Sequence, residues 1–317
     1  MGRYLIRRVL QFIPVFIGAT FLIYALVFAL PGDPIRALGG DKPLSNSVVA
    51  ALEDRYNLND PLLIQYGKYI GVVPDDKRGF SGILQGDLGE NFRGRQVADI
   101  VSERLPVTVK LATTAFVFEI ILGLIAGILA GLRRGGFLDN LVLVSTVAVI
   151  SIPSLVTGFL AQIVFGVELR WLPVSGIQSG WTSYVMPGIV LASLSLAYIA
   201  RLTRTSLVEN LRADYVRTAT AKGLTRGRVV GVHTLRNSLI PVVTFLGIDL
   251  GSLLAGAIVT EGIFNLPGIG QATFLAVQGQ DYPTVVGIVT ALVLIFIVAN
   301  LVVDLLYAVL DPRIRLG

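Results

Sequence analysis

The 317-residue sequence contains no cysteine and only one histidine, His233. The absence of cysteine excludes a disulfide scaffold, a thiolate metal site and a cysteine nucleophile, and one histidine cannot build a multi-histidine metal centre. The phosphate-binding pattern G-x-x-x-x-G-K-[ST] and the catalytic patterns H-E-x-x-H and G-x-S-x-G are also missing. We therefore expect a non-catalytic chain with no metal and no cofactor of its own.

Charged residues are scarce as well, at 15% of the chain against about 25% in ordinary soluble domains. Apolar residues reach 54%, and 34 glycines add to them, which is more than a soluble core of this size can bury. Six apolar runs approach the roughly 20 residues that a helix needs to cross a bilayer. They are Val9–Leu30, Thr108–Leu132, Leu138–Phe165, Met186–Leu202, Leu239–Thr260 and Val285–Leu310. The composition thus predicts an all-α membrane protein with six transmembrane helices, and Pro153 and Pro187 predict kinks or broken ends in the third and fourth.

The distribution of lysine and arginine predicts the orientation. The first run follows three arginines and has no small-x-small cleavage site, so we expect an uncleaved helix. With the N-terminus inside, the inner segments hold fifteen Lys and Arg residues, and the two short outer loops hold only Arg170. Both termini are therefore predicted to be cytoplasmic.

The loop after the first helix, residues 31–107, is too long for a mere connector and is predicted to lie outside. Apolar residues at helical spacing predict short amphipathic helices within residues 45–58 and 60–70. Residues 71–95 are rich in glycine and aspartate and predict turns.

The largest inner segment, Arg201–Ser238, does not have the sequence of a random solvated loop. Asp214 is a good N-cap for a short helix, and Gly223 can supply the left-handed residue that ends it. Thr225 can cap a second helix that leads to Pro241 and back into the membrane. The first helix has small side chains at residues 218–221 and a basic rim, so we expect it to insert into the cleft of a partner.

This segment resembles the inner loop of ABC-importer permeases, whose pattern is E-A-A, three residues, Gly, nine residues, I-x-L-P. The sequence keeps the pattern at Ala219, Gly223 and Leu235, and it departs from it at Arg217, Thr218, His233 and Arg236. DYVRTATAKGL followed by HTLRNSLIPVV looks like the variant of the oligopeptide and dipeptide branch. The opening RYLIRRVLQFIPVFIGATFLIYALVFALPGDP, then RLPVTVKLA, EGIFNLPGIG and the ending DLLYAVLDPRIR extend the resemblance over nearly the whole chain.

The resemblance implies the type I ABC-importer permease fold and the role of a B-type permease subunit of a dipeptide or oligopeptide system in a prokaryotic cell membrane. The implied domains are an N-terminal helix with its extracytoplasmic loop, residues 1–103, and a transmembrane core, residues 104–311. The implied partners are a second permease subunit, two ATPase subunits that bind ATP and Mg, an extracytoplasmic substrate-binding protein, membrane lipid and a peptide substrate, with no nucleic acid. The residues expected to couple to the ATPases are Arg217, Thr218, Ala219, Ala221, Lys222, Gly223, His233, Leu235 and Arg236.

Carboxylates inside hydrocarbon are expensive, so each is a functional candidate. Glu119 and Asp249 are candidate contacts of the substrate pathway, with an interhelical packing role as the equal alternative. For Asp304 we favour packing. Glu261, in the EGIFNLPGIG turn, either contacts substrate at the outer mouth or faces water.

Two alternatives compete with the peptide permease. Permeases for nickel or glutathione belong to the same family, but a chain without cysteine, with two methionines and one histidine offers no path of soft metal ligands, so peptide is favoured over nickel. A secondary transporter or channel predicts inverted repeats with broken helices, and no convincing internal repeat is present. His233 is interpreted as an interface residue rather than as a proton relay.

Overall fold

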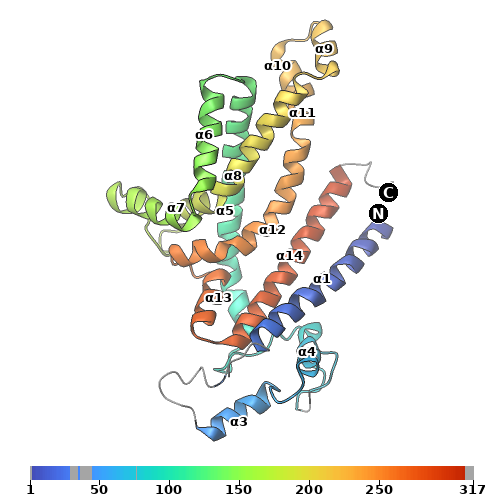
Figure 1. Cartoon of the computed structure of the whole chain (residues 1–317), viewed down its shortest axis with the longest axis vertical. Helices are drawn as coiled ribbons and strands as arrows, with labels where there is room; N and C mark the ends of the chain where they lie inside the picture. Colours follow the sequence, from blue (N-terminus) through green and yellow to red (C-terminus); the bar gives the residue numbers. More distant parts are fainter. Residues whose placement is uncertain (1, 29–34, 36–44, 76, 311–317) are drawn as a thin grey trace. The chain divides into compact units, whose positions relative to one another are not determined.

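The computed structural model describes residues 2–28, 35, 45–75 and 77–310. Within these ranges the chain is helical, and extended pairing is limited to two isolated bridges, Asp75 with Gly79 and Glu90 with Gln96. The helices, labelled in Figure 1, fall into two compact units. One unit contains the residues up to Val107 and those from Pro267 to Ala308, and the other contains Thr108–Leu266. The predicted all-α class is confirmed, whereas the division at residue 103 stays a prediction.

Four helices are long and apolar enough to cross a membrane: Ile6–Phe28, Val97–Leu132, Thr182–Asn210 and Tyr282–Val303. Two bent pairs bring the number to six if each pair counts as one span. These are Phe137–Ser151 with Ser154–Glu168, bent by 103°, and Arg226–Ser238 with Ile240–Leu254, bent by 44°. The six predicted runs fall on the helices that contain these spans, except that residues 29 and 30 lie outside the described ranges. The fifth and sixth runs continue past the span ends at Leu254 and Val303, within α12 and α14.

The two prolines at which the sequence predicts kinks or broken ends, Pro153 and Pro187, behave differently. The helix that begins at Phe137 ends at Ser151, and the next begins at Ser154, directly after Pro153, so the predicted break is confirmed. Pro187 lies inside Thr182–Asn210, and that helix continues through it. Because Pro187 is in the second turn, its missing N–H removes a hydrogen bond near the helix end rather than in the middle. The expected broken end at Pro187 is therefore wrong, and a kink there stays a prediction.

The first unit contains the predicted outer loop. Its elements are α1 (Gly2–Phe28), α3 (Asn46–Arg55), α4 (Leu62–Ile70), the 3₁₀ turn η1 (Ile83–Gln85), the first turns of α5 (Val97–Leu132), α13 (Ile269–Gln278) and α14 (Tyr282–Leu310). Val97, Ile269, Ala272 and Ile288 form its buried cluster. The predicted helices within 45–58 and 60–70 are confirmed as α3 and α4, and the predicted turns are confirmed between them and α5, where five glycines have positive φ.

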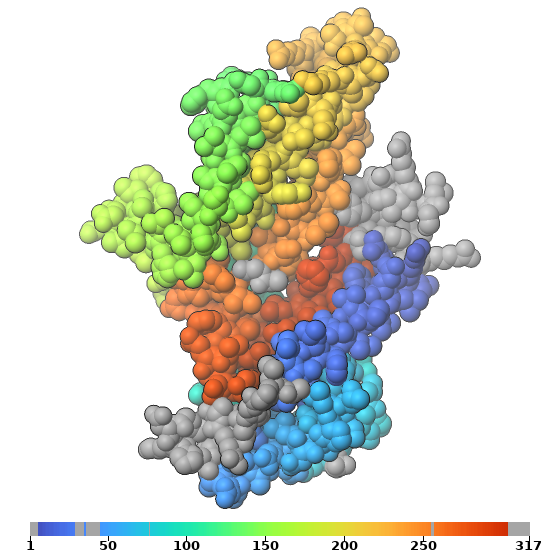
Figure 2. Space-filling view, in the orientation of Figure 1, coloured from blue at the N-terminus to red at the C-terminus, as the bar shows by residue number. Residues whose placement is uncertain are grey.

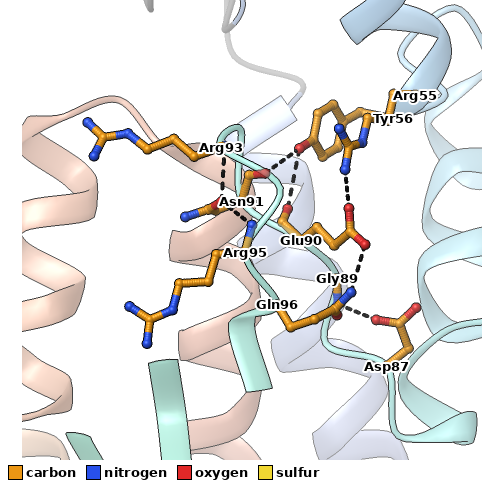
Figure 3. A network of polar contacts seen from close by, with 9 residues as sticks. All are labelled: Arg55, Tyr56, Asp87, Gly89, Glu90, Asn91, Arg93, Arg95 and Gln96. Carbon is orange, nitrogen blue, oxygen red and sulfur yellow. Dashed lines mark hydrogen bonds and ion pairs between the residues drawn. The ribbon is translucent and has the colours of Figure 1, made fainter. Parts of the chain in front are cut away.

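A polar network fixes the end of this loop before α5 (Figure 3). The guanidinium of Arg55 on α3 binds the carboxylate of Glu90. The Tyr56 hydroxyl donates to the Asn91 carbonyl at 2.9 Å, and the Asn91 side chain accepts the backbone N–H groups of Arg93 and Arg95 at 3.0 and 2.8 Å. Burial raises the pKa of Tyr56 to about 12, so the phenol keeps the proton that it donates. The loop is therefore ordered by its own hydrogen bonds.

The second unit is built around α8 (Thr182–Asn210). Its other elements are the rest of α5, α6 (Phe137–Ser151), α7 (Ser154–Ala161), the π-helix η2 (Gln162–Glu168), α9 (Asp214–Ala221), α10 (Arg226–Arg228), the π-helix η3 (Val229–Thr234), α11 (Leu235–Ser238) and α12 (Ile240–Ile263). Helix α8 contacts α6, α7, α11 and α12. A Cβ at Gly127 of α5 would lie 2.5 Å from the Thr203 Cβ and 2.6 Å from the Ala200 oxygen of α8. Gly123, Gly127 and Gly131 of α5, which all face α8, thus let the two helix backbones approach closely.

A buried ion pair ties the turn between α5 and α6 to α8. Asp139 is 1% exposed, and its carboxylate accepts hydrogen bonds from both Nε and Nη2 of Arg204, the latter at 2.8 Å. The backbone N–H of Gly135 donates to the same carboxylate at 2.8 Å. A bidentate pair with a third donor is the geometry in which a buried ion pair is satisfied.

We predict that Asp139→Asn lowers the free energy of unfolding by about 3 kcal/mol, because it leaves the Arg204 charge without its counter-ion in a largely buried site. The matched control is Asp214→Asn, whose carboxylate is 96% exposed and lies 3.5 Å from Arg217. Exposed pairs of this kind contribute about 0–1 kcal/mol. The free energy of unfolding of both variants is measured in mixed detergent micelles. Equal values for the two variants would contradict the assignment of Asp139 and Arg204 as a stabilising buried ion pair.

Candidate functional site

The inner segment predicted to couple to a partner, Arg201–Ser238, begins within α8, which continues to Asn210. Helix α9 starts at Asp214, and the residue that caps it is Ala213, with extended backbone angles of −69° and 149°. The carbonyl of Ala213 accepts the N–H groups of Val216 and Arg217. The prediction of Asp214 as the N-cap is therefore wrong by one position. Asp214 occupies the first turn, where a carboxylate favours the positive end of the helix dipole.

Gly223 ends α9 as predicted. It has φ of +76°, its N–H bonds the Thr220 oxygen at 3.0 Å, and the N–H of Leu224 bonds the Ala219 oxygen at 3.3 Å. These two bonds define the Schellman motif, in which a left-handed residue satisfies the last carbonyls of the helix. Leu224 packs onto the cluster that contains Ala219, which is the hydrophobic contact that commonly accompanies this motif.

The two faces of α9 have different surroundings. Val216 and Ala219 are buried against Val229. Arg217, Thr218, Ala221 and Lys222 are exposed. Ala219 therefore packs within its own chain, and it does not lie on the face that a partner can reach, contrary to the expectation that its small side chain enters a partner's cleft. The exposed face carries the remaining predicted residues of α9.

The second half of the segment is anchored to α8. Thr225 precedes α10 with extended angles and its carbonyl accepts the Val229 N–H at 3.0 Å, which confirms its cap position. The Ser238 hydroxyl lies 3.4 Å from the Ser206 oxygen of α8 and donates to the Thr234 oxygen at 2.8 Å. His233 and Leu235 are half-buried, whereas Arg236 is exposed. The predicted coupling residues thus divide into an exposed set in and just after α9 together with Arg236, a half-buried pair, His233 and Leu235, and the buried Ala219.

The exposed tip formed by α9 and α10 is basic. Arg217, Lys222, Arg226 and Arg228 are all exposed, and the one ion pair described among these side chains, Arg217 with Asp214, is open to solvent on both sides. Figure 2 shows this tip as the yellow-orange end of the second unit. A rigid, cationic projection with a short neutral patch at Thr218 and Ala221 is suited to a complementary protein surface.

The structure brings two of the candidate pathway carboxylates together. Glu119 of α5 lies beside Asp249 of α12, and both are buried, at 0% and 8% exposure. The sequence predicts each of these residues as a separate candidate. It does not predict the pair, because Glu119 and Asp249 lie far apart along the chain.

Glu261, the third candidate, is fully buried, and the Thr108 hydroxyl donates to its Oε1 at 2.6 Å. The alternative that Glu261 faces water is therefore wrong. The side chain of Asp304 lies outside the described residues. Asp139 and Arg204, which sequence reasoning did not single out as a pair, hold the base of α8 from which α9 projects.

Residues 123–316 match the family described as "Binding-protein-dependent transport system inner membrane component", and residues 1–112 match the corresponding N-terminal family. A chain from a structure of inward-facing conformations of the MetNI methionine ABC transporter matches with a TM-score of 0.55 at 18% identity, and the match covers 68% of this chain and 97% of that chain. This likeness supports the type I ABC-importer permease fold.

The similar curated proteins cover the chain almost completely. The dipeptide transport system permease protein of Alkalihalophilus pseudofirmus is 36% identical over 99% of this chain and 100% of its own length. The di/tripeptide transport system permease protein of Pseudomonas aeruginosa is 37% identical over 99% of both chains. The glutathione transport system permease protein of Escherichia coli O6:H1 is 40% identical over 99% of both. The chain therefore belongs to the family of inner membrane components of binding-protein-dependent transport systems, the ABC-importer permeases.

Proposed function

We propose that this chain is one of two permease subunits in an ATP-driven importer of short peptides, and that α9 couples it to ATPase subunits. The observation that carries the proposal is the exposed basic face of α9, ended by Gly223 and held on its other side by the chain's own core. ATP and Mg would bind to the partner ATPases, because this chain has no phosphate-binding loop. The second permease subunit and an extracytoplasmic binding protein complete the proposed complex.

The proposed orientation places α9 and both termini in the cytoplasm of a prokaryotic cell, with the protein in the inner or plasma membrane. The excess of lysine and arginine in the segments on that side supports it. The loop with α3, α4 and the Arg55–Glu90 network would then face outward, toward the binding protein. In this arrangement ATP-driven movement reaches the spans through α9, and α8 receives it because only residues 211–213 separate the end of α8 from the start of α9.

Short peptides are the proposed substrate because two of the relatives named above are permeases for dipeptides or di- and tripeptides. A second candidate is glutathione, itself a tripeptide. The alignments with the dipeptide relatives extend over 343 residues, so those relatives carry insertions that this chain lacks, whereas the alignment with the glutathione permease extends over 316. The chain's own length is closer to the glutathione relative, and uptake experiments must therefore compare both substrates.

We predict that membrane vesicles containing the complex import a labelled dipeptide when ATP is supplied, and that unlabelled dipeptides compete. Competition by glutathione alone would favour the second candidate. Absence of uptake for both substrates, with a binding protein present that is loaded with each of them, would contradict the peptide proposal.

We predict that Ala221→Trp reduces substrate-stimulated ATP hydrolysis by at least about tenfold, equivalent to about 1.4 kcal/mol of coupling, because a bulky ring obstructs the exposed face of α9. Gly223→Val should act in the same direction, since a β-branched side chain opposes the φ of +76° that ends the helix. ATP hydrolysis by the purified complex, with and without loaded binding protein, measures both.

The matched control is Ala51→Trp, which places the same side chain at an exposed alanine of α3 and should leave stimulation unchanged. Ala219→Trp should instead destabilise the chain, because Ala219 is buried. Full stimulation in Ala221→Trp and Gly223→Val would refute the role of α9.

A further inference from the structure

Helices α5, α8 and α12 of the second unit carry polar side chains at one level along their length, and apolar side chains lie at the levels on either side of it. Ala115 of α5, Ala192 of α8 and Leu253 of α12 belong to one buried cluster. Ile120, Ile199 and Leu246 of the same helices belong to the next. Ser195 lies three residues after Ala192 and four before Ile199, and Asp249 lies three after Leu246 and four before Leu253. Residues three or four apart share a helix face, so Ser195 and Asp249 lie at the level between the two clusters, and Glu119 lies one turn after Ala115 on α5.

The register of α5 against α8 fixes this level independently. A Cβ at Gly123 would lie 2.8 Å from Cγ2 of Ile199, and one at Gly131 would lie 3.0 Å from Cδ2 of Leu207. Gly127 meets Thr203 with the same offset in sequence. One turn before Gly123, this offset pairs Glu119 with Ser195, and the Ser195 hydroxyl donates to Oδ1 of Asp249 at 3.0 Å.

The polar level contains two carboxylates and no described counter-ion. Glu119 is completely buried and Asp249 is 8% exposed. Neither oxygen of Glu119, nor Oδ2 of Asp249, has a hydrogen-bond partner among the described residues. On α8, Tyr198 lies three residues after Ser195, and its ring packs on Phe245 of α12 with the ring centroids 4.4 Å apart. The titratable groups that face each other across α5, α8 and α12 at this level are therefore Glu119 and Asp249.

Two ionised carboxylates cannot both remain in such a place. Each loses its hydration on burial, and their like charges repel at short range in a medium of low dielectric constant. One proton removes the repulsion and provides the donor that the unpaired oxygens lack.

We propose that Glu119 and Asp249 together form a proton-binding site, in which one shared proton joins the Glu119 carboxyl group to Oδ2 of Asp249 at neutral pH. The proton comes from water and returns to water, and no other bond forms or breaks. Ser195 supplies the second donor to Asp249, so the protonated site joins α5, α8 and α12 at one level. Exchange of the proton requires these helices to separate, because both side chains are buried in the packed state.

This assignment differs from a substrate contact and from an ordinary ion pair. A contact with a peptide ammonium group needs an ionised carboxylate that is open to the pathway. A proton site needs a carboxylic acid that is closed to water and that an amide can replace, since glutamine keeps a donor and an acceptor in nearly the same shape.

Infrared spectroscopy of the full-length chain in its purified complex tests the site, because a protonated carboxylic acid has a carbonyl stretching band that a carboxylate lacks. We expect this band in the wild type at neutral pH, its loss in Glu119→Gln, and a shift of its frequency in Asp249→Asn, where the acceptor changes. Glu103→Gln, at an exposed carboxylate on the same helix, is the matched control and should leave the band unchanged.

A second readout separates the proton site from a merely structural carboxyl group. Raising the pH should lower the thermal stability of the wild-type complex as the shared proton is lost, and Glu119→Gln should reduce this dependence. Ser195→Ala should weaken the site, whereas Ser193→Ala, whose hydroxyl bonds its own helix at the Val190 oxygen, should not. Absence of the carboxylic-acid band in the wild type at neutral pH would overturn the proposal without any variant, and so would a band unchanged in both Glu119→Gln and Asp249→Asn.

Discussion

The close approach of α5 and α8 is the contact on which the second unit depends. It exists because Gly123, Gly127 and Gly131 have no side chains, so that the α5 backbone lies directly against Ile199, Thr203 and Leu207. Without a hydrophobic driving force between helices in lipid, such contacts supply van der Waals packing in its place. The same register brings Glu119 level with Ser195 in the middle of the unit. At its end, α8 presents Arg204 to the buried Asp139.

The proposed coupling surface begins a few residues after the end of this anchored helix. Helix α8 ends at Asn210, and the chain then forms α9, which is terminated by Gly223. It returns through η3 and α11, where the Ser238 hydroxyl contacts the Ser206 oxygen of α8. One face of α9 is fixed to this return segment through Val216 and Ala219. In the proposed function, a helix held in this way transmits force to α8 while its exposed face contacts the partner.

Local chemistry explains which features the sequence predicts. Gly223 is predictable because few residues adopt positive φ at a helix end, and the break at Pro153 is predictable because proline removes a backbone donor. The burial of Ala219 is not predictable in this way, because it depends on Val229, which packs against α9 only after the chain has turned at Gly223. The continuity of α8 through Pro187 depends on where that helix begins, which is several residues before the apolar run. The pairing of Glu119 with Asp249 requires the register of three helices, which no local pattern contains.

The central claim is that the exposed face of α9 is the surface that meets the ATPase subunits. A photo-activated cross-linking residue at Lys222, on that face, tests it directly when the intact complex is illuminated, with the same residue at the exposed Leu84 of the outer loop as the comparison. The account predicts that Lys222 cross-links to an ATPase subunit and that Leu84 does not. Cross-links from Leu84 to the ATPase, or from Lys222 to the extracytoplasmic binding protein, would contradict it.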